Sequence, residues 1–254
     1  MTSQTIDIHY QTLVLPPPYA YTYRLWIELA SSELRVSLDW QYTGRDELSE
    51  EEVWEEGFSP NDDFRWKGNL PSAWLPPLRS LLEQTHWLPE ATASVEDTLI
   101  TFTTADTEKP AVRRIPHNLP EWDYLLQELI QGIYEVSQRE LPLQIRYLDI
   151  NGKYKTEATM EAQFAHRQFT VAARDHNQSH TSELPWSALR PLLSALSVPD
   201  YHADQAQSTV PRQNGRYIHP GDAWYRLGRA VTNPGKTDAV ARLQQAIAEL
   251  ISKP

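Results

Sequence analysis

Two histidines four residues apart, His176 and His180, are the pair in this chain best spaced to hold a metal ion. On a helix that spacing would place both imidazoles on one face, as in zinc peptidases. The local sequence Asp-His-Asn-Gln-Ser is instead typical of a turn, and no glutamate follows the first histidine. The chain has no cysteine, which excludes thiolate nucleophiles and cysteine-based metal sites. We therefore predict exposed loop histidines and no cofactor, with a metal at His176 and His180 as the weaker alternative.

A Gly-Lys-Thr sequence within residues 230–240 invites comparison with a phosphate-binding loop. That motif needs a glycine where this chain has Ala230, and it needs a buried strand before the loop, where the chain is short and polar. We interpret Gly235 as a turn residue and Thr237 or Asp238 as the cap of a last helix. The chain also lacks a Gly-x-Ser-x-Gly elbow, so its local motifs identify no catalytic nucleophile.

Tryptophan and tyrosine are abundant, at nine and 12 residues against five phenylalanines, and both types suit ligand stacking and protein interfaces. Several lie beside a stretch with nine carboxylates and no basic residue, from Asp46 to Asp63. A competing interpretation puts Trp40 and Tyr42 in a hairpin core, has Trp54 fold the acidic stretch back onto the sheet, and leaves the charges as a solvated rim. The candidate binding surface comprises Trp40, Tyr42, Arg45, Trp54, Asp62, Asp63, Arg65 and Trp66.

The charge of the chain limits its partners. Its net charge of −11 repels phosphate backbones, so we expect no nucleic-acid partner. Residues 205–254 differ from the rest, because seven Lys or Arg against three Asp or Glu give them a net charge of +4. The acidic surface therefore has two candidate partners, a separate basic protein and this C-terminal segment. The apolar run 13–15 stops at three prolines, and no basic residue precedes Arg24, so we predict a cytoplasmic protein without a membrane anchor.

Two hairpins are the clearest structural signals. Residues 34–42 and 23–29 alternate apolar with polar side chains across a short polar connection, which predicts an antiparallel pair. A second hairpin is centred on Asn151-Gly152, a dipeptide that suits a type I′ turn, and this turn would set Arg146 opposite Glu157. Weaker strand signals lie at residues 98–104, 112–115 and 167–174.

Leucine-rich stripes with helical spacing predict the helices. Three of the stripes follow Leu-Pro pairs, and proline is tolerated in a first helical turn. A further apolar stripe predicts a last helix that starts near Thr237 or Asp238. In the acidic stretch, Ser49 and Glu52 form a capping box, with Gly57 suited to the position after the helix. Residues 200–222 lack periodicity and predict a long loop. The three pairs are Leu70-Pro71, Leu119-Pro120 and Leu184-Pro185.

These elements predict an α+β fold, in which antiparallel hairpins form one or two sheets and amphipathic helices pack on one face. Residues 70–82 match residues 184–196 at seven of 13 positions, and a hairpin precedes each segment. Either a strand-strand-helix unit was duplicated, or proline-started amphipathic helices resemble one another by composition. The expected organisation is a first α+β unit at 1–118 with an acidic insertion at 46–63, a central helix and second unit at 119–204, and a basic segment at 205–254 ending in a docked helix.

Two functions are consistent with these features. The preferred hypothesis is a non-enzymatic interaction module that uses the acidic, aromatic surface around residues 40–66. The alternative is an enzyme acting on a small polar or sugar-like ligand, with carboxylates or His176 and His180 as polar groups.

Overall fold

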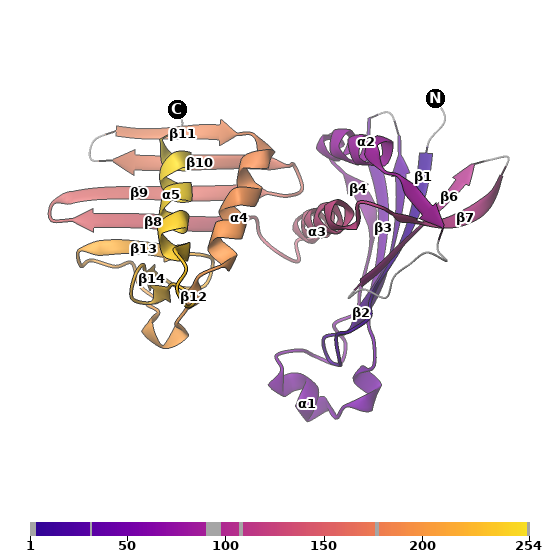
Figure 1. The fold of residues 1–254 in the computed structure, drawn as a ribbon, viewed down its shortest axis with the longest axis horizontal. Coiled ribbons are helices and arrows are strands. Elements are labelled where there is room, and N and C mark those ends of the chain that lie inside the picture. The colour runs from indigo at the N-terminus through magenta and orange to yellow at the C-terminus, as the bar shows by residue number, and fades with distance from the viewer. Residues whose placement is uncertain (1–3, 31, 90–97, 107–108, 176–177, 253–254) are drawn as a thin grey trace. The chain divides into compact units, whose positions relative to one another are not determined.

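The chain forms two compact units, Met1–Arg139 and Glu140–Pro254, in this computed structural model. Each unit is an antiparallel sheet with helices on one face, which confirms the predicted α+β class (Figure 1). The central helix at 119–136 belongs to the first unit rather than opening the second, and the boundary follows it. The structure describes residues 4–30, 32–89, 98–106, 109–175 and 178–252.

The first unit contains a seven-stranded sheet in the order β4-β3-β2-β1-β6-β7-β5. The predicted first hairpin is confirmed, because Leu29 pairs with Leu34 and Tyr21 with Tyr42. The weaker signals at 98–104 and 112–115 also mark strands, whereas β1 was not predicted. The strands are β1 (Gln4–Thr12), β2 (Tyr21–Leu29), β3 (Leu34–Tyr42), β4 (Phe64–Leu70), β5 (Trp87–Pro89), β6 (Thr98–Asp106) and β7 (Lys109–Pro116).

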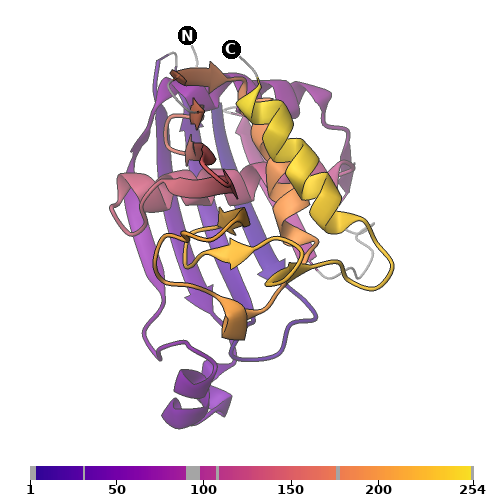
Figure 2. The same cartoon turned by 90° about the vertical axis from the view of Figure 1, so that its left-hand side faces the viewer.

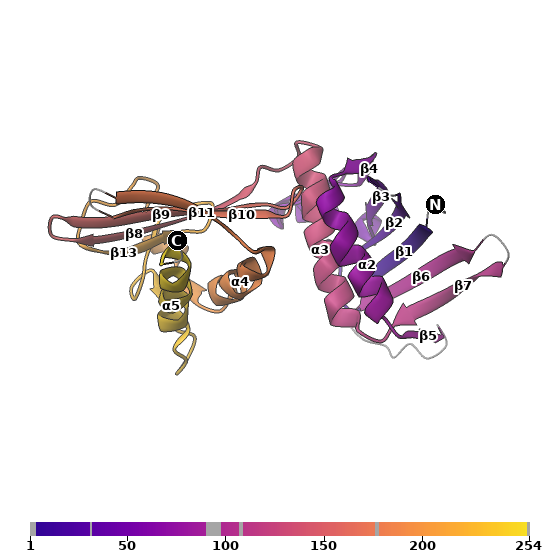
Figure 3. The ribbon, with the colours of Figure 1, turned by 90° about the horizontal axis from the view of Figure 1, so that it is seen from above.

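Helices α2 (Leu75–Gln84) and α3 (Leu119–Val136) pack on one face of this sheet (Figure 3). Both carry proline in the first turn, as predicted. The Trp122 side chain is fully buried, and its Nε1 donates a hydrogen bond to Thr85 Oγ1 at 2.8 Å. This bond joins α3 to the end of α2 within the core. Among the described residues, every helix falls short of the length or hydropathy that a membrane-spanning helix needs.

The second unit contains a six-stranded sheet in the order β11-β10-β9-β8-β13-β14 and a separate β12-β15 pair. Helices α4 (Leu189–Ser197) and α5 (Ala239–Ile251) lie beside each other on one face of the larger sheet (Figures 2 and 3). Leu192 and Leu243 are among the buried residues of the core that they form. The strands are β8 (Leu143–Asn151), β9 (Tyr154–Gln163), β10 (Gln168–Asp175), β11 (Gln178–Leu184), β12 (Asp200–Tyr201), β13 (Gly215–His219), β14 (Tyr225–Arg226) and β15 (Val231–Thr232).

The β8-β9 hairpin forms at the predicted place, but the predicted register is wrong. Asn151 pairs with Tyr154, so Gly152 and Lys153 occupy the turn, and Arg146 lies opposite Thr159 rather than Glu157. Of the two turn residues only Gly152 has a positive φ, at 64°, which fits glycine in the first central position of a type II′ turn. The register is displaced by two residues, which leaves every side chain on its predicted face.

The predicted long loop at 200–222 is partly wrong, because it contains strand β13. Tyr217 and Ile218 are buried there and pair with Leu148 and Tyr147 of β8. The last helix begins as predicted, after Asp238, but no side chain of Thr237 or Asp238 caps it. A side chain from the preceding loop does so instead, since Asn233 Oδ1 accepts a hydrogen bond from the backbone N–H of Val240 at 2.8 Å.

The two units share one strand order. In each, a four-stranded meander leads through Leu-Pro and a 3-10 turn into a helix, and later strands extend the sheet beside the first strand of the meander, namely β6, β7 and β5 in the first unit and β13 and β14 in the second. The last hairpins of the two meanders differ in their connection. The final pair is Trp40 with Phe64 in the first unit and Asp175 with Gln178 in the second, so the acidic stretch stands where the second unit has two residues. Internal duplication itself stays a prediction.

Candidate functional site

Residues 41–63, here called the acidic extension, project beyond the paired ends of β3 and β4 (Figure 1). Arg45 holds the base of this extension together, with a side chain that is only 9% exposed. Its Nη1 donates to the Ser59 carbonyl at 2.6 Å and to Asp62 Oδ2 at 3.1 Å, and its guanidinium lies 3.6 Å from the centroid of the Tyr42 ring. Arg45, Tyr42 and Asp62 are therefore brought together, in a structural role.

Hydrogen bonds keep Asp62, at the foot of the acidic extension, in its charged form. Burial alone would raise the pKa of Asp62, but hydrogen bonds from the Ser59 N–H and hydroxyl and from Arg45 outweigh burial and lower it. The neighbouring Asp63 accepts a hydrogen bond from the backbone N–H of Tyr42 at 2.9 Å. Both carboxylates are used to close the extension, which leaves neither free to act as a general acid or base.

Trp40 lies in a row of stacked aromatic rings on the helix side of the first sheet. Its ring centroid is 4.2 Å from that of Tyr21 and 5.2 Å from that of Tyr23, and Tyr10 stacks on Tyr23 at 4.6 Å. The Trp40 Nε1 is buried and has no hydrogen-bond partner within the described residues. Trp40 therefore packs within the hairpin, as the competing interpretation has it.

Arg65 and Trp66 are not part of one surface, because neighbouring residues of a strand point to opposite faces. Arg65 Nε lies 3.0 Å from Asp39 Oδ1 on the exposed face. The Trp66 ring lies over Gly68 and packs on the core, where a Cβ at Gly68 would fall 2.5 Å from the indole.

Helix α1 (Glu50–Glu55) presents the most exposed tryptophan of the predicted surface. Its start is the predicted capping box, in which Ser49 and Glu52 exchange hydrogen bonds, and Gly57 follows its end with φ 82°. Val53 anchors the helix, being only 2% exposed, whereas the next residue, Trp54, is 64% exposed. Trp54 thus does not fold the extension back onto the sheet. Within the described residues, five carboxylates around it have no ionic or hydrogen-bond partner: Asp46, Glu47, Glu50, Glu51 and Glu55.

The loop between β1 and β2, residues 13–20, supports the extension and was not predicted to be part of the site. The Pro18 carbonyl accepts a hydrogen bond from Arg45 Nε at 3.1 Å, and the Tyr19 hydroxyl donates to a Glu56 carboxylate oxygen. In the same loop Val14 is 64% exposed. In the sequence, only the apolar run 13–15 before the prolines drew attention to this loop. In the structure the run places an apolar surface next to the acidic extension.

The histidine pair is not brought into a metal site by the described residues. His176 lies outside them, and His180 is an exposed residue of β11 whose Nε2 is 3.1 Å from the Ile251 carbonyl oxygen. In the described part of the chain, no three His, Asp or Glu side chains are grouped to hold a metal ion.

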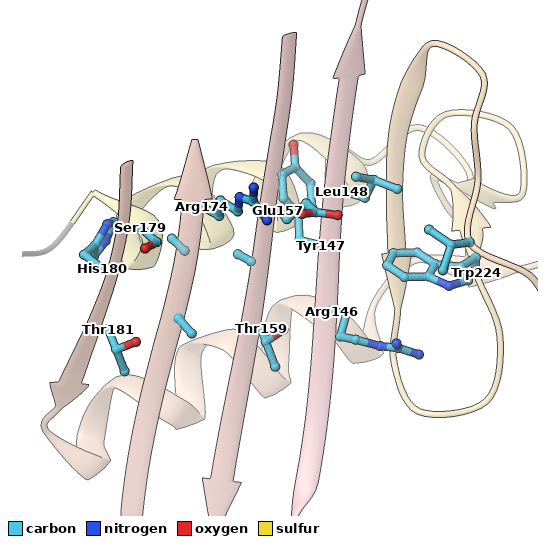
Figure 4. A pocket seen from close by; sticks show the side chains of 14 residues that line it. Arg146, Tyr147, Leu148, Glu157, Thr159, Arg174, Ser179, His180, Thr181 and Trp224 are labelled. Carbon is cyan, nitrogen blue, oxygen red and sulfur yellow. The ribbon is translucent and has the colours of Figure 1, made fainter. Parts of the chain in front are cut away.

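A hollow of about 370 Å³ lies over the second sheet and was not predicted (Figure 4). Arg146, Arg174 and Trp224 line it; the first two come from β8 and β10, and Trp224 directly precedes β14. Arg146 alternates with the buried Ile145 of the helix-side core, which places Arg146 on the opposite face of the sheet. The residues lie far apart in the sequence, so no local motif indicated them.

Comparisons with protein-family models, curated proteins and solved structures give no match to this chain. Functional inference therefore starts from two described features, one in each unit. The acidic extension and the β1-β2 loop offer an exposed indole, unpaired carboxylates and apolar side chains. The hollow of the second sheet offers arginine side chains and an indole.

Proposed function

We propose that the chain is a non-enzymatic binding module whose acidic extension and β1-β2 loop hold a basic, partly apolar segment of another protein. The observation that carries this proposal is Trp54, an indole left 64% exposed on a helix whose other contacts are well formed. Tryptophan is the residue type most enriched where binding energy concentrates. An exposed tryptophan on a structured projection is therefore the natural contact for a partner.

The charges around Trp54 define the partner. Five carboxylates of the extension have no ionic partner in the described structure, and Trp54 lies among them in the sequence. Basic side chains would neutralise these carboxylates, while apolar side chains would cover Trp54 and Val14. Because the carboxylates are exposed, the attraction is screened by salt and acts mainly on the association rate.

The shape of the extension favours binding of this kind. Arg45 is held by hydrogen bonds to Ser59, Asp62 and Pro18, so the base is ordered before a partner arrives. A preorganised surface loses less conformational entropy on association than a flexible one. The contacts that Trp54 makes with a partner then need not offset the entropy cost of ordering the extension.

A separate basic chain is the proposed partner in preference to the C-terminal segment of the same chain. Residues 205–252 form strands and a helix of the second unit. Several of their basic groups already have partners there, since Arg216 pairs with Asp149 and Arg242 with Asp238. The segment is thus folded into the second unit rather than being a free tail, although Arg212, Arg226, Arg229 and Lys236 form no ion pair within the described residues.

A labelled synthetic peptide of alternating lysine and leucine is the probe for this proposal, with fluorescence anisotropy as the readout. We expect salt-sensitive binding that weakens at least tenfold in Trp54→Ala, since truncation of an interface tryptophan costs about 2 kcal/mol or more. Deleting residues 46–63 should abolish binding, and the remaining residues 41–45 can still close the β3-β4 hairpin.

Charge-matched variants separate the surface from net charge. Neutralising Glu50, Glu51 and Glu55 together should weaken binding, whereas three exposed carboxylates elsewhere serve as the control. The proposal is wrong if both triple variants weaken binding equally, or if the 46–63 deletion still binds the peptide. The control substitutions are Glu83→Gln, Glu121→Gln and Asp204→Asn.

The second candidate function is an enzyme, or a binding protein, for a small polar ligand. The hollow over the second sheet is the observation that favours it, because cavities of this size accommodate small molecules. The histidine and carboxylate roles first considered for such an enzyme have no support from described geometry, since His180 contacts a backbone carbonyl and Asp62 closes a turn.

A further inference from the structure

Short side chains form the floor of the hollow over the second sheet. Strand pairing sets Arg146, Thr159, Ala172 and Thr181 in one row across β8, β9, β10 and β11. The three residues after Arg146 are small, while taller side chains stand at the border of the row, among them Trp224 (Figure 4). The hollow therefore follows from side-chain size on an otherwise continuous sheet face.

The arginines of this hollow are not neutralised by the described protein. Arg174 lies opposite Glu157 in the β9-β10 pairing, but Glu157 forms its ion pair with Lys155, at 2.5 Å. Arg146 forms no ion pair or hydrogen bond within the described residues, and its guanidinium lies 5.2 Å from the Trp224 ring. Two guanidinium groups are thus left without an ion-pair partner in the described structure, beside a cavity whose lining also includes the Glu157 carboxylate.

The first unit provides a comparison within the same chain. Its sheet face away from the helices also carries arginines, and three of them have a carboxylate partner there. Since the two sheets share one strand order, unpaired arginines are a property of the second sheet and not of the fold. The pairs of the first unit are Arg24 with Asp7, Arg35 with Glu28, and Arg65 with Asp39.

We propose that this hollow binds a small organic anion, a carboxylate or phosphate carried on an apolar or aromatic group. Arg146 and Arg174 would bind the anionic group, because guanidinium matches the geometry of both oxyanions. Thr159 and Thr181 supply hydroxyl donors on the floor, and Trp224 with its neighbours supplies the apolar wall. The strands that carry the two arginines are separated only by β9, or roughly 10 Å, and Arg174 stands two residues, or about 7 Å, along the strands from the Arg146 row, a diagonal that two long arginine side chains can bridge over one ligand.

The apolar part of the proposed ligand follows from the side of the hollow formed by Trp224 and Val210. The indole is only 5% exposed and is packed by Leu148 and Tyr217, so it forms a rigid wall. Val210, which also lines the hollow, is 50% exposed and could cover the apolar part of a ligand. An inorganic ion would leave Val210 in contact with water and would gain only the charge interaction.

The test is isothermal titration of the full-length protein with benzoate, phenyl phosphate, inorganic phosphate and neutral benzamide. We expect one of the two aromatic anions to bind saturably at one site per chain, and at least tenfold more tightly than benzamide and inorganic phosphate. The preference between benzoate and phenyl phosphate identifies the anion. Arg146→Gln and Arg174→Gln should each lower this affinity at least tenfold, while the matched control Arg65→Gln should not change it.

Three results would overturn the proposal. These are binding of benzamide as tight as that of the anions, full affinity in the Arg146→Gln, Arg174→Gln double variant, and no saturable binding of either aromatic anion at millimolar concentration. Arg174 is exposed and has no ion-pair or hydrogen-bond partner among the described residues, so Arg174→Gln should fold even if substitution of Arg146 disturbs the sheet. Trp54→Ala, which tests the first unit, should leave the titration unchanged and so keeps the two proposals distinguishable.

Discussion

Asp123 on α3 is a half-buried carboxylate that the first unit keeps without full hydrogen bonding. Its Oδ1 is buried and has no partner within the described residues, while Oδ2 accepts a hydrogen bond from Gln127 at 2.9 Å. Burial raises the pKa of Asp123 despite that hydrogen bond. The charged form is therefore less favourable in the folded protein than in the unfolded chain.

This arrangement predicts that Asp123→Asn stabilises the first unit at neutral pH. Because the folded pKa lies above the unfolded one, the wild type loses stability as pH rises from the unfolded value through the folded one. The gain from Asp123→Asn should be complete above the folded pKa and should vanish below about pH 4, the ordinary aspartate value. Urea unfolding at pH 7 and pH 3.5 measures it, with Glu121→Gln as an exposed control on the same helix. An equal effect at both pH values would contradict the burial argument.

His219 gives the second unit a pH dependence of the opposite direction. Burial first, and then the charge of Arg146, lower the pKa of His219, and its Nδ1 is buried without a partner in the described structure. The unfolded chain binds the proton more readily, so stability is present above the ordinary histidine pKa of about 6.5 and is lost as pH falls through the lower folded value.

We therefore predict that the Tm of the second unit falls between pH 7.5 and pH 5, and falls less in His219→Asn. The imidazole must charge next to Arg146 and Trp224, whereas asparagine does not titrate. Differential scanning calorimetry across this pH range measures the difference. His180→Asn, which removes an exposed histidine of the same sheet, should behave like the wild type.

At the scale of elements, α1 depends on its cap, because it is six residues long and buries one side chain. Ser49→Ala removes the hydroxyl that accepts from the Glu52 N–H, while the Ser49 N–H can still donate to the Glu52 carboxylate, and it should cost about 1 kcal/mol of local helix stability. We expect faster hydrogen exchange of the α1 amides and weaker binding of the basic peptide, with an unchanged global Tm. Ser49→Asp keeps a capping group and should retain both properties. A fall in global Tm with Ser49→Ala would show that the extension stabilises the sheet directly.

Local spacing predicted the helices and the capping box, because both depend on residues within one or two turns. The alternation of Ile6 and Ile8 with polar residues also indicates β1, although that strand was not predicted. The register of β8-β9 could not be obtained in this way. A two-residue displacement leaves the apolar row facing the same side, so the pattern is the same for both registers. Strand β13 was missed because only Tyr217 and Ile218 of its five residues are buried.

The sites were less predictable than the elements. The sequence located the acidic extension and Trp54, but Arg45 and Asp62 were assigned to a binding surface when they hold the extension closed. That role depends on the Pro18 and Ser59 carbonyls, which no side-chain pattern indicates. The hollow of the second sheet depends on the pairing of four strands. Arg174 is left without an ion pair because Glu157 pairs with Lys155 instead.

At the scale of the whole molecule, each unit has its own core. Trp74 and Trp122 belong to the core of the first unit, and Phe169 and Leu243 to that of the second. We therefore predict that residues 1–139 and 140–254 fold when expressed separately, each with a cooperative thermal transition and β-rich circular dichroism. If neither fragment shows a cooperative transition, the division between Arg139 and Glu140 does not separate independent folding units.

The unequal connections of the two meanders also set an order of folding. Closing a flexible loop costs free energy that grows with the logarithm of its length, so residues 41–63 cost about 2 kcal/mol more to close than the two residues between Asp175 and Gln178. That difference slows pairing of β3 with β4 but not of β10 with β11. When the full-length chain refolds from the unfolded state, we therefore expect β10 to pair with β11 before β3 pairs with β4.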